Sequence, residues 1–163
     1  MGDHNNDDQS RAPPNPLKSR RSNVKAFVSF KNSTDRIVDV IWMNFAGQRQ
    51  TYTENGLAPG RQLNMHTFEG HPWIVRDKVT GDTLEFVDHG VGRLIYMPER
   101  WDGERFYRAP IIKIRVPIYS LYERSLQIVR QLIHNQDNVD ELEIPKQVKY
   151  DLCHVRDIIP QAP

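Results

Sequence analysis

In the stretch Val24-Lys25-Ala26-Phe27-Val28-Ser29-Phe30-Lys31, apolar side chains stand at Val24, Ala26, Val28 and Phe30, every second position. Successive side chains of a β-strand point to opposite faces, so this pattern predicts a strand with one buried face. Similar short segments, each bounded by Gly, Asp, Asn or Pro, follow at Ile37 to Trp42, Gln48 to Tyr52, Leu63 to Thr67, Trp73 to Arg76, Thr83 to Val87, Arg93 to Met97 and Ile112 to Val116. Seven or eight strands with no helical segment between them predict an antiparallel β-sandwich.

After Pro117 the period changes to that of a helix, and a short helical α domain is expected to follow the sandwich. Ser120 and Glu123 have the spacing of a capping box at the helix start. Eight mostly apolar side chains fall within an arc of about 160°, wider than the roughly 100° stripe that a helix on a sandwich needs. They are Leu121, Tyr122, Ser125, Leu126, Ile128, Val129, Leu132 and Ile133. One flank is therefore predicted to be a protein interface, with packing against the C-terminal tail as the alternative.

These patterns divide the chain into four parts. We expect a disordered polar tail over residues 1–22, a β-sandwich over 23–117, an α domain over 118–158 and a tail over 159–163. The α domain would hold a helix over 120–134 and a short C-terminal helix with Pro145 at its first position. Lys18, Arg20 and Arg21 form a basic cluster, for which a solvated tail is the simpler interpretation and a nuclear import signal the alternative.

Composition excludes several classes of protein. The net charge of +1 gives no strong electrostatic case for binding nucleic acid. A single cysteine, Cys153, allows no internal disulfide and indicates a reducing compartment, so we expect the protein in the cytoplasm and nucleus. No run of 18 apolar residues is present to span a membrane, and the polar N-terminus is unlike a signal peptide.

The segment His66–Asp77 places two imidazoles, a hydroxyl and an indole beside a turn. This set indicates a small recognition pocket with a few fixed polar groups. His66 and His71 are poorly spaced for a shared metal, and no third ligand is evident. Cys153 and His154 are neighbours in sequence, which alone does not make a nucleophile and base. We therefore predict no catalytic residue, no metal and no cofactor.

Several segments together resemble the von Hippel-Lindau tumour suppressor family. Those similar to its β domain and to its elongin-binding helix are Ile41–Gly47, Tyr52, Gly70–Asp77, Val116–Tyr119 and Ser120–Arg130. The resemblance runs from about Leu17 to Ile133, in matching order. The acidic N-terminal extension of the human form is not seen, so an invertebrate member is expected.

The resemblance implies a non-catalytic substrate receptor of a cullin–RING ubiquitin ligase. In the family, the β domain binds a proline-hydroxylated degron of hypoxia-inducible factor α. The α domain binds elongin C, which bridges to elongin B, a cullin and its RING subunit. A β-sandwich peptide-binding module that recruits no ligase is the alternative.

The resemblance also assigns a hydroxyproline-peptide site, comprising Trp42, Tyr52, Asn64, Met65, His66, Thr67, Phe68, His71 and Trp73. Hydroxyproline is a compact apolar ring with one hydroxyl. Trp42, Tyr52 and Trp73 would supply aromatic walls, and Thr67 and His71 a hydrogen-bond pair. The strand around residues 64–66 would offer backbone hydrogen bonds to an extended peptide.

The implied elongin C contacts are Leu121, Tyr122, Ser125, Leu126 and Val129. Ser125 stands where the family has Cys, and its hydroxyl would need to bond back to the carbonyl of Leu121. A weaker match to a cullin box comprises Leu142, Ile144, Pro145 and Val148. Further departures near the pocket are Thr67 for serine, Thr53 for proline and Arg21 for asparagine.

Overall fold

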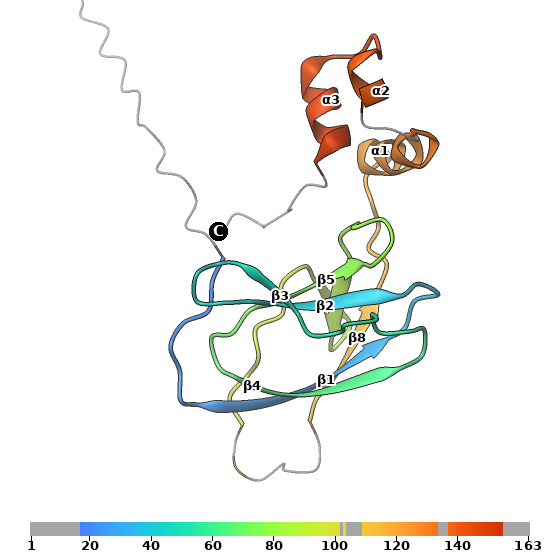
Figure 1. Cartoon of the computed structure of the whole chain (residues 1–163). Helices are drawn as coiled ribbons and strands as arrows, with labels where there is room; N and C mark the ends of the chain where they lie inside the picture. The colour runs from blue at the N-terminus through green and yellow to red at the C-terminus, as the bar shows by residue number, and fades with distance from the viewer. Residues whose placement is uncertain (1–16, 102, 104–108, 134–136, 155–163) are drawn as a thin grey trace, which may run out of the picture.

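The computed structural model describes residues 17–101, 103, 109–133 and 137–154. Within them the chain forms eight strands and three helices (Figure 1). The strands are β1 (Lys25–Asn32), β2 (Val38–Met43), β3 (Arg49–Thr51), β4 (Gln62–Phe68), β5 (Trp73–Asp77), β6 (Glu85–Asp88), β7 (Val91–Arg93) and β8 (Ile111–Arg115). The helices are α1 (Leu121–Leu132), α2 (Asp137–Asp140) and α3 (Lys146–Cys153). The predicted sandwich followed by a small helical part is confirmed.

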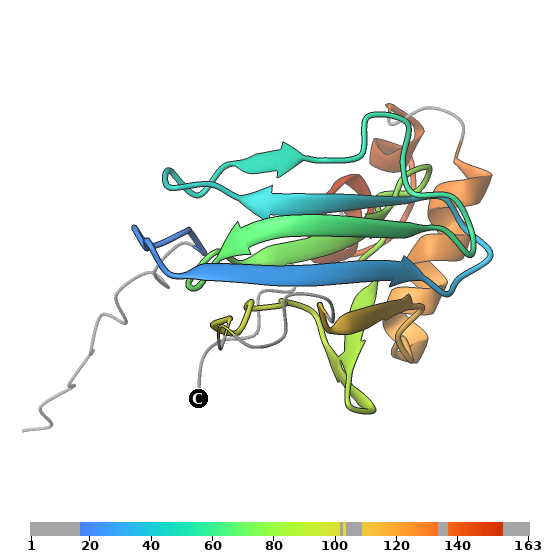
Figure 2. The ribbon, with the colours of Figure 1, turned by 90° about the horizontal axis from the view of Figure 1, so that it is seen from below.

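The strands form two sheets that pack face to face. One sheet has the order β4-β1-β8-β6-β7, and the other has the order β3-β2-β5 (Figures 1 and 2). Their inner faces enclose one apolar core, formed by Val28, Phe30, Val38, Val40, Leu57, Trp73, Val75, Leu84, Phe86, Tyr96, Ile112 and Ile114. β1 therefore buries one of its faces, as its period-two pattern predicted.

One strand pair runs against the antiparallel prediction. β1 and β8 are parallel, with Ser29 opposite Ile111 and Asn32 opposite Ile114. The other paired strands of the described residues are antiparallel. The rest of the sandwich lies between β1 and β8 in the chain, so no tight turn dictates their relative direction.

The strand expected from Arg93 to Met97 is split. β7 ends at Arg93, and Tyr96 instead bridges to β5 of the other sheet. The backbone N–H groups of Tyr96 and Trp73 each donate to the other residue's carbonyl over 2.9 Å. The Tyr96 ring then packs on Phe30 and Phe86 in the core. Burial of this ring draws the chain across to the second sheet.

The N-terminal tail meets the sandwich earlier than expected. Residues 17–20, here called the N-terminal strap, are held against β2 and the turn at Gly70. The N–H of Ser19 donates to the carbonyl of Asn44 over 3.1 Å, and that of Arg20 donates to the carbonyl of Gly70 over 3.0 Å. These bonds correct the boundary expected at residue 22, because the segment has backbone partners despite its polar composition. Residues 1–16 and the expected tail over 159–163 lie outside the described residues.

The predicted capping box starts α1. The Ser120 side chain accepts from the Glu123 N–H, and the Glu123 carboxylate accepts from the Ser120 N–H. α3 also forms where a short helix was expected, although Pro145 is its N-cap and Lys146 its first helical residue. His134, the expected last residue of the first helix, lies outside the described part of the chain.

The wide apolar stripe of α1 divides into two flanks. Leu126 is buried, and Val129 and Ile133 pack beside it, in a second core with residues of α2 and α3. The other flank is exposed and is called the α1 ridge; it consists of Leu121, Ser125, Ile128 and Leu132. Leu121 and Leu132 keep 85% and 70% of their surface accessible. The C-terminal helices thus cover only one flank.

Among the described residues, no helix combines the length and apolar character needed to cross a membrane.

Candidate functional site

Five side chains from separate elements converge at one end of the sandwich. Trp42 lies in β2, Tyr52 directly after β3, Thr67 in β4, Trp73 in β5 and His71 in the turn before β5. The Trp42 and His71 rings stack, with centroids 5.2 Å apart and planes at 27°. Tyr52 makes edge contacts with Trp42 at 6.4 Å and with Trp73 at 5.1 Å. These residues, here called the aromatic pocket, are brought together as predicted.

Two polar groups of the aromatic pocket remain available to a ligand. The Thr67 hydroxyl accepts from the Trp73 indole N–H over 3.2 Å, which leaves its own proton for another acceptor. The His71 Nε2 atom is buried and has no hydrogen-bond partner among the described residues. A buried polar atom without a partner in the native fold calls for an explanation, and a ligand atom is one.

Burial also controls the charge of His71. Desolvation lowers the pKa of the His71 imidazole below its ordinary value of 6.5. The ring is therefore neutral at pH 7, with one nitrogen protonated and the other able to accept. A neutral imidazole and a threonine hydroxyl in one pocket can serve a ligand hydroxyl as acceptor and donor.

A tight turn sets the position of His71. Gly70 has φ of 76°, a left-handed conformation that glycine adopts without strain. The N–H of His71 donates to the carbonyl of Phe68 over 3.2 Å, and the Phe68 ring lies 5.3 Å from the imidazole. The turn thus directs the imidazole toward Trp42.

The pocket residues differ in depth. Trp73 is 2% exposed and belongs to the central core, so it supports the fold as well as the pocket cluster. Tyr52 is 44% exposed and is the most accessible of the three aromatic residues. Its N–H donates to the carbonyl of Val40, whose own N–H donates to the buried Thr53 hydroxyl. Thr53, which replaces the family's proline, therefore fixes the backbone that carries Tyr52.

β4 contributes fewer side chains to the pocket than the resemblance implied. The Asn64 side chain accepts from the Ser29 hydroxyl over 2.6 Å, and the His66 ring lies against Phe27 at 4.8 Å. Asn64 and His66 alternate with the pocket residue Thr67 and lie on the outer face of the sheet, whereas Met65 packs against the core. Asn64 and His66 therefore add no side chain to the aromatic pocket, and their predicted backbone hydrogen bonds to a peptide stay a prediction. Because β4 is an edge strand, its backbone stays accessible to a peptide.

Two pocket neighbours were missed from the sequence. The Phe45 ring lies 5.5 Å from Trp42 and 5.4 Å from His71. The Ser19 hydroxyl accepts from the Trp42 indole N–H over 2.6 Å. Phe45 stands in a turn segment and Ser19 in a polar stretch, so neither has a periodicity that signals a contact. Arg21, one of the departures from the family, is exposed.

The residues implied for elongin C do not all face solvent. Leu121, Tyr122 and Ser125 are exposed, and the Ser125 hydroxyl donates to the carbonyl of Leu121 over 2.8 Å, as its position required. Val129 is half-buried. Leu126 is only 6% exposed and packs in the α-domain core, so its assignment to the open surface is corrected.

The expected cullin-box residues lie mostly inside the α domain. Leu142, Ile144 and Val148 pack against the core formed by Leu126, Val139 and Leu152. Pro145 is exposed at the start of α3. Leu142, Ile144 and Val148 therefore stabilise the α domain from inside.

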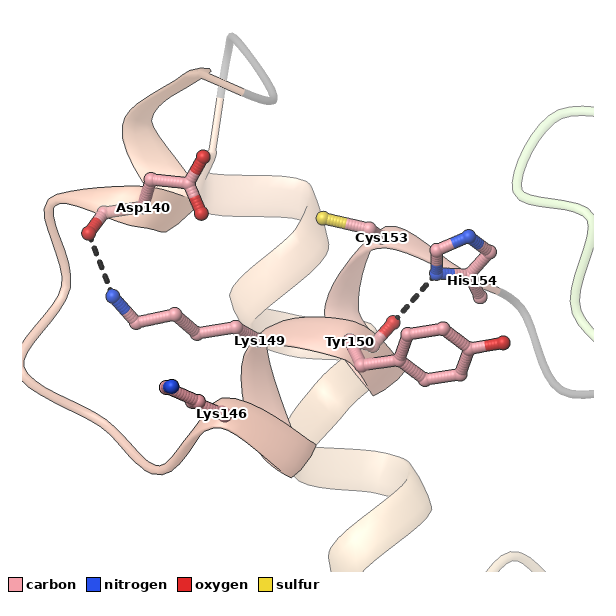
Figure 3. A pocket seen from close by; sticks show the side chains of 6 residues that line it. All are labelled: Asp140, Lys146, Lys149, Tyr150, Cys153 and His154. Carbon is pink, nitrogen blue, oxygen red and sulfur yellow. Dashed lines mark hydrogen bonds between the residues drawn. The ribbon is translucent and has the colours of Figure 1, made fainter.

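A shallow hollow lies on α2 and α3, lined by Asp140, Lys146, Lys149, Tyr150, Cys153 and His154 (Figure 3). The Lys149 ammonium donates to the carbonyl of Asp140 over 2.6 Å. The His154 ring stacks on Tyr150, and its Nδ1 lies 2.9 Å from the Tyr150 carbonyl. The Cys153 sulfur points away from that ring, so these two residues form no nucleophile–base pair. Among the described residues, no three potential metal ligands gather at one point.

Comparisons with known proteins agree with this geometry. Residues 17–98, from the strap to the end of the Tyr96 bridge, match the model of the VHL beta domain. The chain is also 25% identical over 142 residues to Protein Vhl of Drosophila melanogaster, covering 79% of this chain and 76% of that protein. The fly relative accords with the predicted invertebrate origin. By these matches, the chain belongs to the VHL family, whose members are substrate-recognition adaptors and not catalytic enzymes.

Proposed function

We propose that this chain is the substrate-recognition subunit of an elongin BC–cullin–RING ubiquitin ligase. It would bind the proline-hydroxylated degron of hypoxia-inducible factor α under normoxia and direct that protein to ubiquitination and proteasomal degradation, in the cytoplasm and nucleus. The observation that carries the proposal is the buried, unpartnered Nε2 of His71, in a ring that stacks on Trp42. The same cluster of rings includes Trp73, whose indole N–H donates to the Thr67 hydroxyl.

The chemistry of hydroxyproline fits this arrangement. Its ring is apolar and would lie against Trp42 and Tyr52. Its hydroxyl can donate to His71 Nε2 and accept from the Thr67 hydroxyl. Unmodified proline would leave the His71 Nε2 atom without a donor and the Thr67 hydroxyl proton without an acceptor, at about 1–3 kcal/mol for each. Sites built around a substrate hydroxyl reject the analogue that lacks it by factors on the order of 10⁴.

The residues that flank the hydroxyproline would bind along β4. This strand is at the edge of the five-stranded sheet and runs directly into the pocket turn. An extended peptide can add to such an edge through backbone hydrogen bonds, with specificity set by side-chain pockets. The modified proline would then be the anchor, and the edge strand would align the peptide.

The α1 ridge supports the recruitment half of the proposal. Leu121, Ile128 and Leu132 expose apolar surface along one flank of the helix. A contiguous exposed apolar surface on a folded domain marks a protein interface. Ser125 adds no unsatisfied donor to this surface, because its hydroxyl already bonds to the Leu121 carbonyl.

Two synthetic degron peptides that differ only in one proline 4-hydroxyl test whether the chain selects the hydroxylated degron. We expect the full chain, co-expressed with elongins B and C, to bind the hydroxylated peptide alone in isothermal titration calorimetry. His71→Ala and Thr67→Val should each remove most of this preference. His66→Ala is the matched control, because that imidazole lies on the outer face of the sheet against Phe27. Equal binding of both peptides, or of neither, would contradict the proposal.

A peptide-binding adaptor that recruits no ligase is the second candidate. The observation in its favour is that Leu142, Ile144 and Val148 are used inside the α domain, which weakens the cullin match. Purification of the chain with elongins B and C but without a cullin would favour this second function.

A further inference from the structure

We infer that Ser19 is a positioning residue of the aromatic pocket, one that holds the indole of Trp42 in place from the N-terminal strap. The inference rests on the proposed function, since it concerns the affinity of the same pocket. Its basis is a hydrogen-bond relay and two backbone ties.

The relay uses both hydrogen-bonding capacities of one hydroxyl. Ser19 Oγ accepts from Trp42 Nε1 over 2.6 Å and donates to the carbonyl of Met43 over 2.5 Å. Ser19 is only 5% exposed, so water does not readily replace either partner. Because the Met43 carbonyl fixes the direction of the hydroxyl proton, the oxygen lone pairs are left for the indole. The indole is thereby locked in one orientation.

The backbone ties place this relay between the two stacked rings of the pocket. The strap bonds to Asn44, just after Trp42, and to Gly70, just before His71. It therefore joins the end of β2 to the pocket turn, the two segments that carry the Trp42–His71 stack. The close approach extends to side chains, since a Cβ on Gly70 would stand 3.4 Å from that of Arg20.

This arrangement has two consequences for a ligand. Trp42 presents only its ring face, because its N–H already has a partner in Ser19. The wall is also ordered before the ligand arrives, so binding does not need to immobilise it. The hydroxyl selectivity of the pocket then rests on Thr67 and His71, while Ser19 controls how tightly the ring as a whole is held.

Binding measurements on the full chain test this role. Loss of one buried hydrogen bond should raise the Kd of Ser19→Ala for the hydroxylated peptide about tenfold. Ser19→Thr keeps the hydroxyl and should restore the wild-type Kd to within about threefold. Ser22→Ala is the matched control, because the Ser22 hydroxyl accepts only locally, from the N–H of Val24 over 3.1 Å.

The indole N–H signals give a readout that needs no ligand. The chain has three tryptophans, so nitrogen-15 spectra contain three indole N–H resonances. In Ser19→Ala the Trp42 resonance should shift, and its proton should exchange with solvent at least tenfold faster. The Trp73 resonance, whose N–H donates to Thr67, should stay in place and reports that the fold is intact.

The outcomes separate this inference from the proposed function. If the wild type binds the hydroxylated peptide and Ser19→Ala binds it equally well, the role of Ser19 is overturned alone. An unchanged Trp42 exchange rate in Ser19→Ala would overturn it as well. If the wild type does not bind the hydroxylated peptide, the proposed function fails and takes this role with it.

Discussion

The aromatic pocket and the α1 ridge are two surfaces of opposite construction. In the pocket, rings from several elements contact one another, and the group left without a partner is a polar atom, Nε2 of His71. On the ridge, the side chains come from a single helix and expose apolar carbon. The pocket is therefore preorganised for a small, defined group, whereas the ridge requires a second protein surface to cover it. The difference predicts that mutations in the pocket and on the ridge affect different properties.

The largest expected effect couples the pocket to the fold. Trp73→Ala should lower the free energy of unfolding by about 3–5 kcal/mol, because a large core side chain is lost. Chemical denaturation of the full chain with urea measures this change. We expect peptide binding to disappear together with folding. An unaltered denaturation midpoint would show that Trp73 serves the pocket alone, and would contradict its place in the core.

A ridge substitution should show the opposite pattern. Leu121→Asp should change the free energy of unfolding of the isolated chain by no more than about 0.5 kcal/mol, as is usual for a surface site. It should weaken binding to elongins B and C at least about a hundredfold, since a charge would be buried in the interface. Affinity capture from co-expression, followed by calorimetry, measures the loss.

Val79→Asp is the control for this ridge experiment. Val79 and Leu121 are equally exposed, at 85% each, but Val79 lies in the loop after β5. Elongin binding should survive Val79→Asp. Equal losses in the two variants would mean that the ridge has no special role.

A smaller effect is expected in the pH dependence of stability, and it arises from His71 in the pocket. Because burial lowers the pKa of His71 below 6.5, the unfolded chain binds a proton at this residue more readily than the native chain. The contribution of His71 to stability is therefore complete above pH 6.5 and is lost as the pH falls toward the native pKa. His71→Phe should remove this part of the pH dependence. Between pH 7.5 and 5 the urea midpoint of the wild type should therefore fall more than that of His71→Phe. Parallel profiles of the two chains would refute the assignment.

The smallest expected effect concerns Ser125. Its hydroxyl is satisfied within the helix, so the change Ser125→Cys, which restores the usual family residue, should alter elongin affinity by less than about threefold. Calorimetry with elongins B and C measures it, with Leu121→Asp as the reference for a large loss. A gain of tenfold or more would indicate that the serine hydroxyl loses its partner when the interface forms.

The sequence predicted those features that depend on local pattern or on a motif. Period-two alternation located the strands, and the spacing of Ser120 and Glu123 located the start of α1. The convergence of Thr67, His71 and Trp73 was expected because the resemblance covered their whole segment. The structure brings the five predicted pocket residues together, while their role in binding hydroxyproline stays a prediction.

The features that could not be predicted depend on contacts between distant segments. The strap has no apolar periodicity, and its order comes from carbonyl groups of Asn44 and Gly70 that only the folded sandwich brings near. The division of the α1 stripe, with Leu126 inside and Leu132 outside, depends on where α3 packs. The parallel pairing of β1 and β8 likewise depends on topology and leaves no signal in either strand alone.

That parallel pairing constrains how the protein is made. β8 lies between β1 and β6 in the middle of the five-stranded sheet, and its Ile112 and Ile114 are completely buried. While the chain is being synthesised, the earlier strands therefore lack a central member until Ile111–Arg115 has left the ribosome, and contacts so distant in sequence form slowly. The nascent sandwich then leaves one edge of β1 unpaired and lacks Ile112 and Ile114 of its core, and such exposed apolar surface is the reason that folding intermediates need chaperones. α1 follows β8 almost immediately in the chain, so the ridge emerges soon after the strand that completes the sheet.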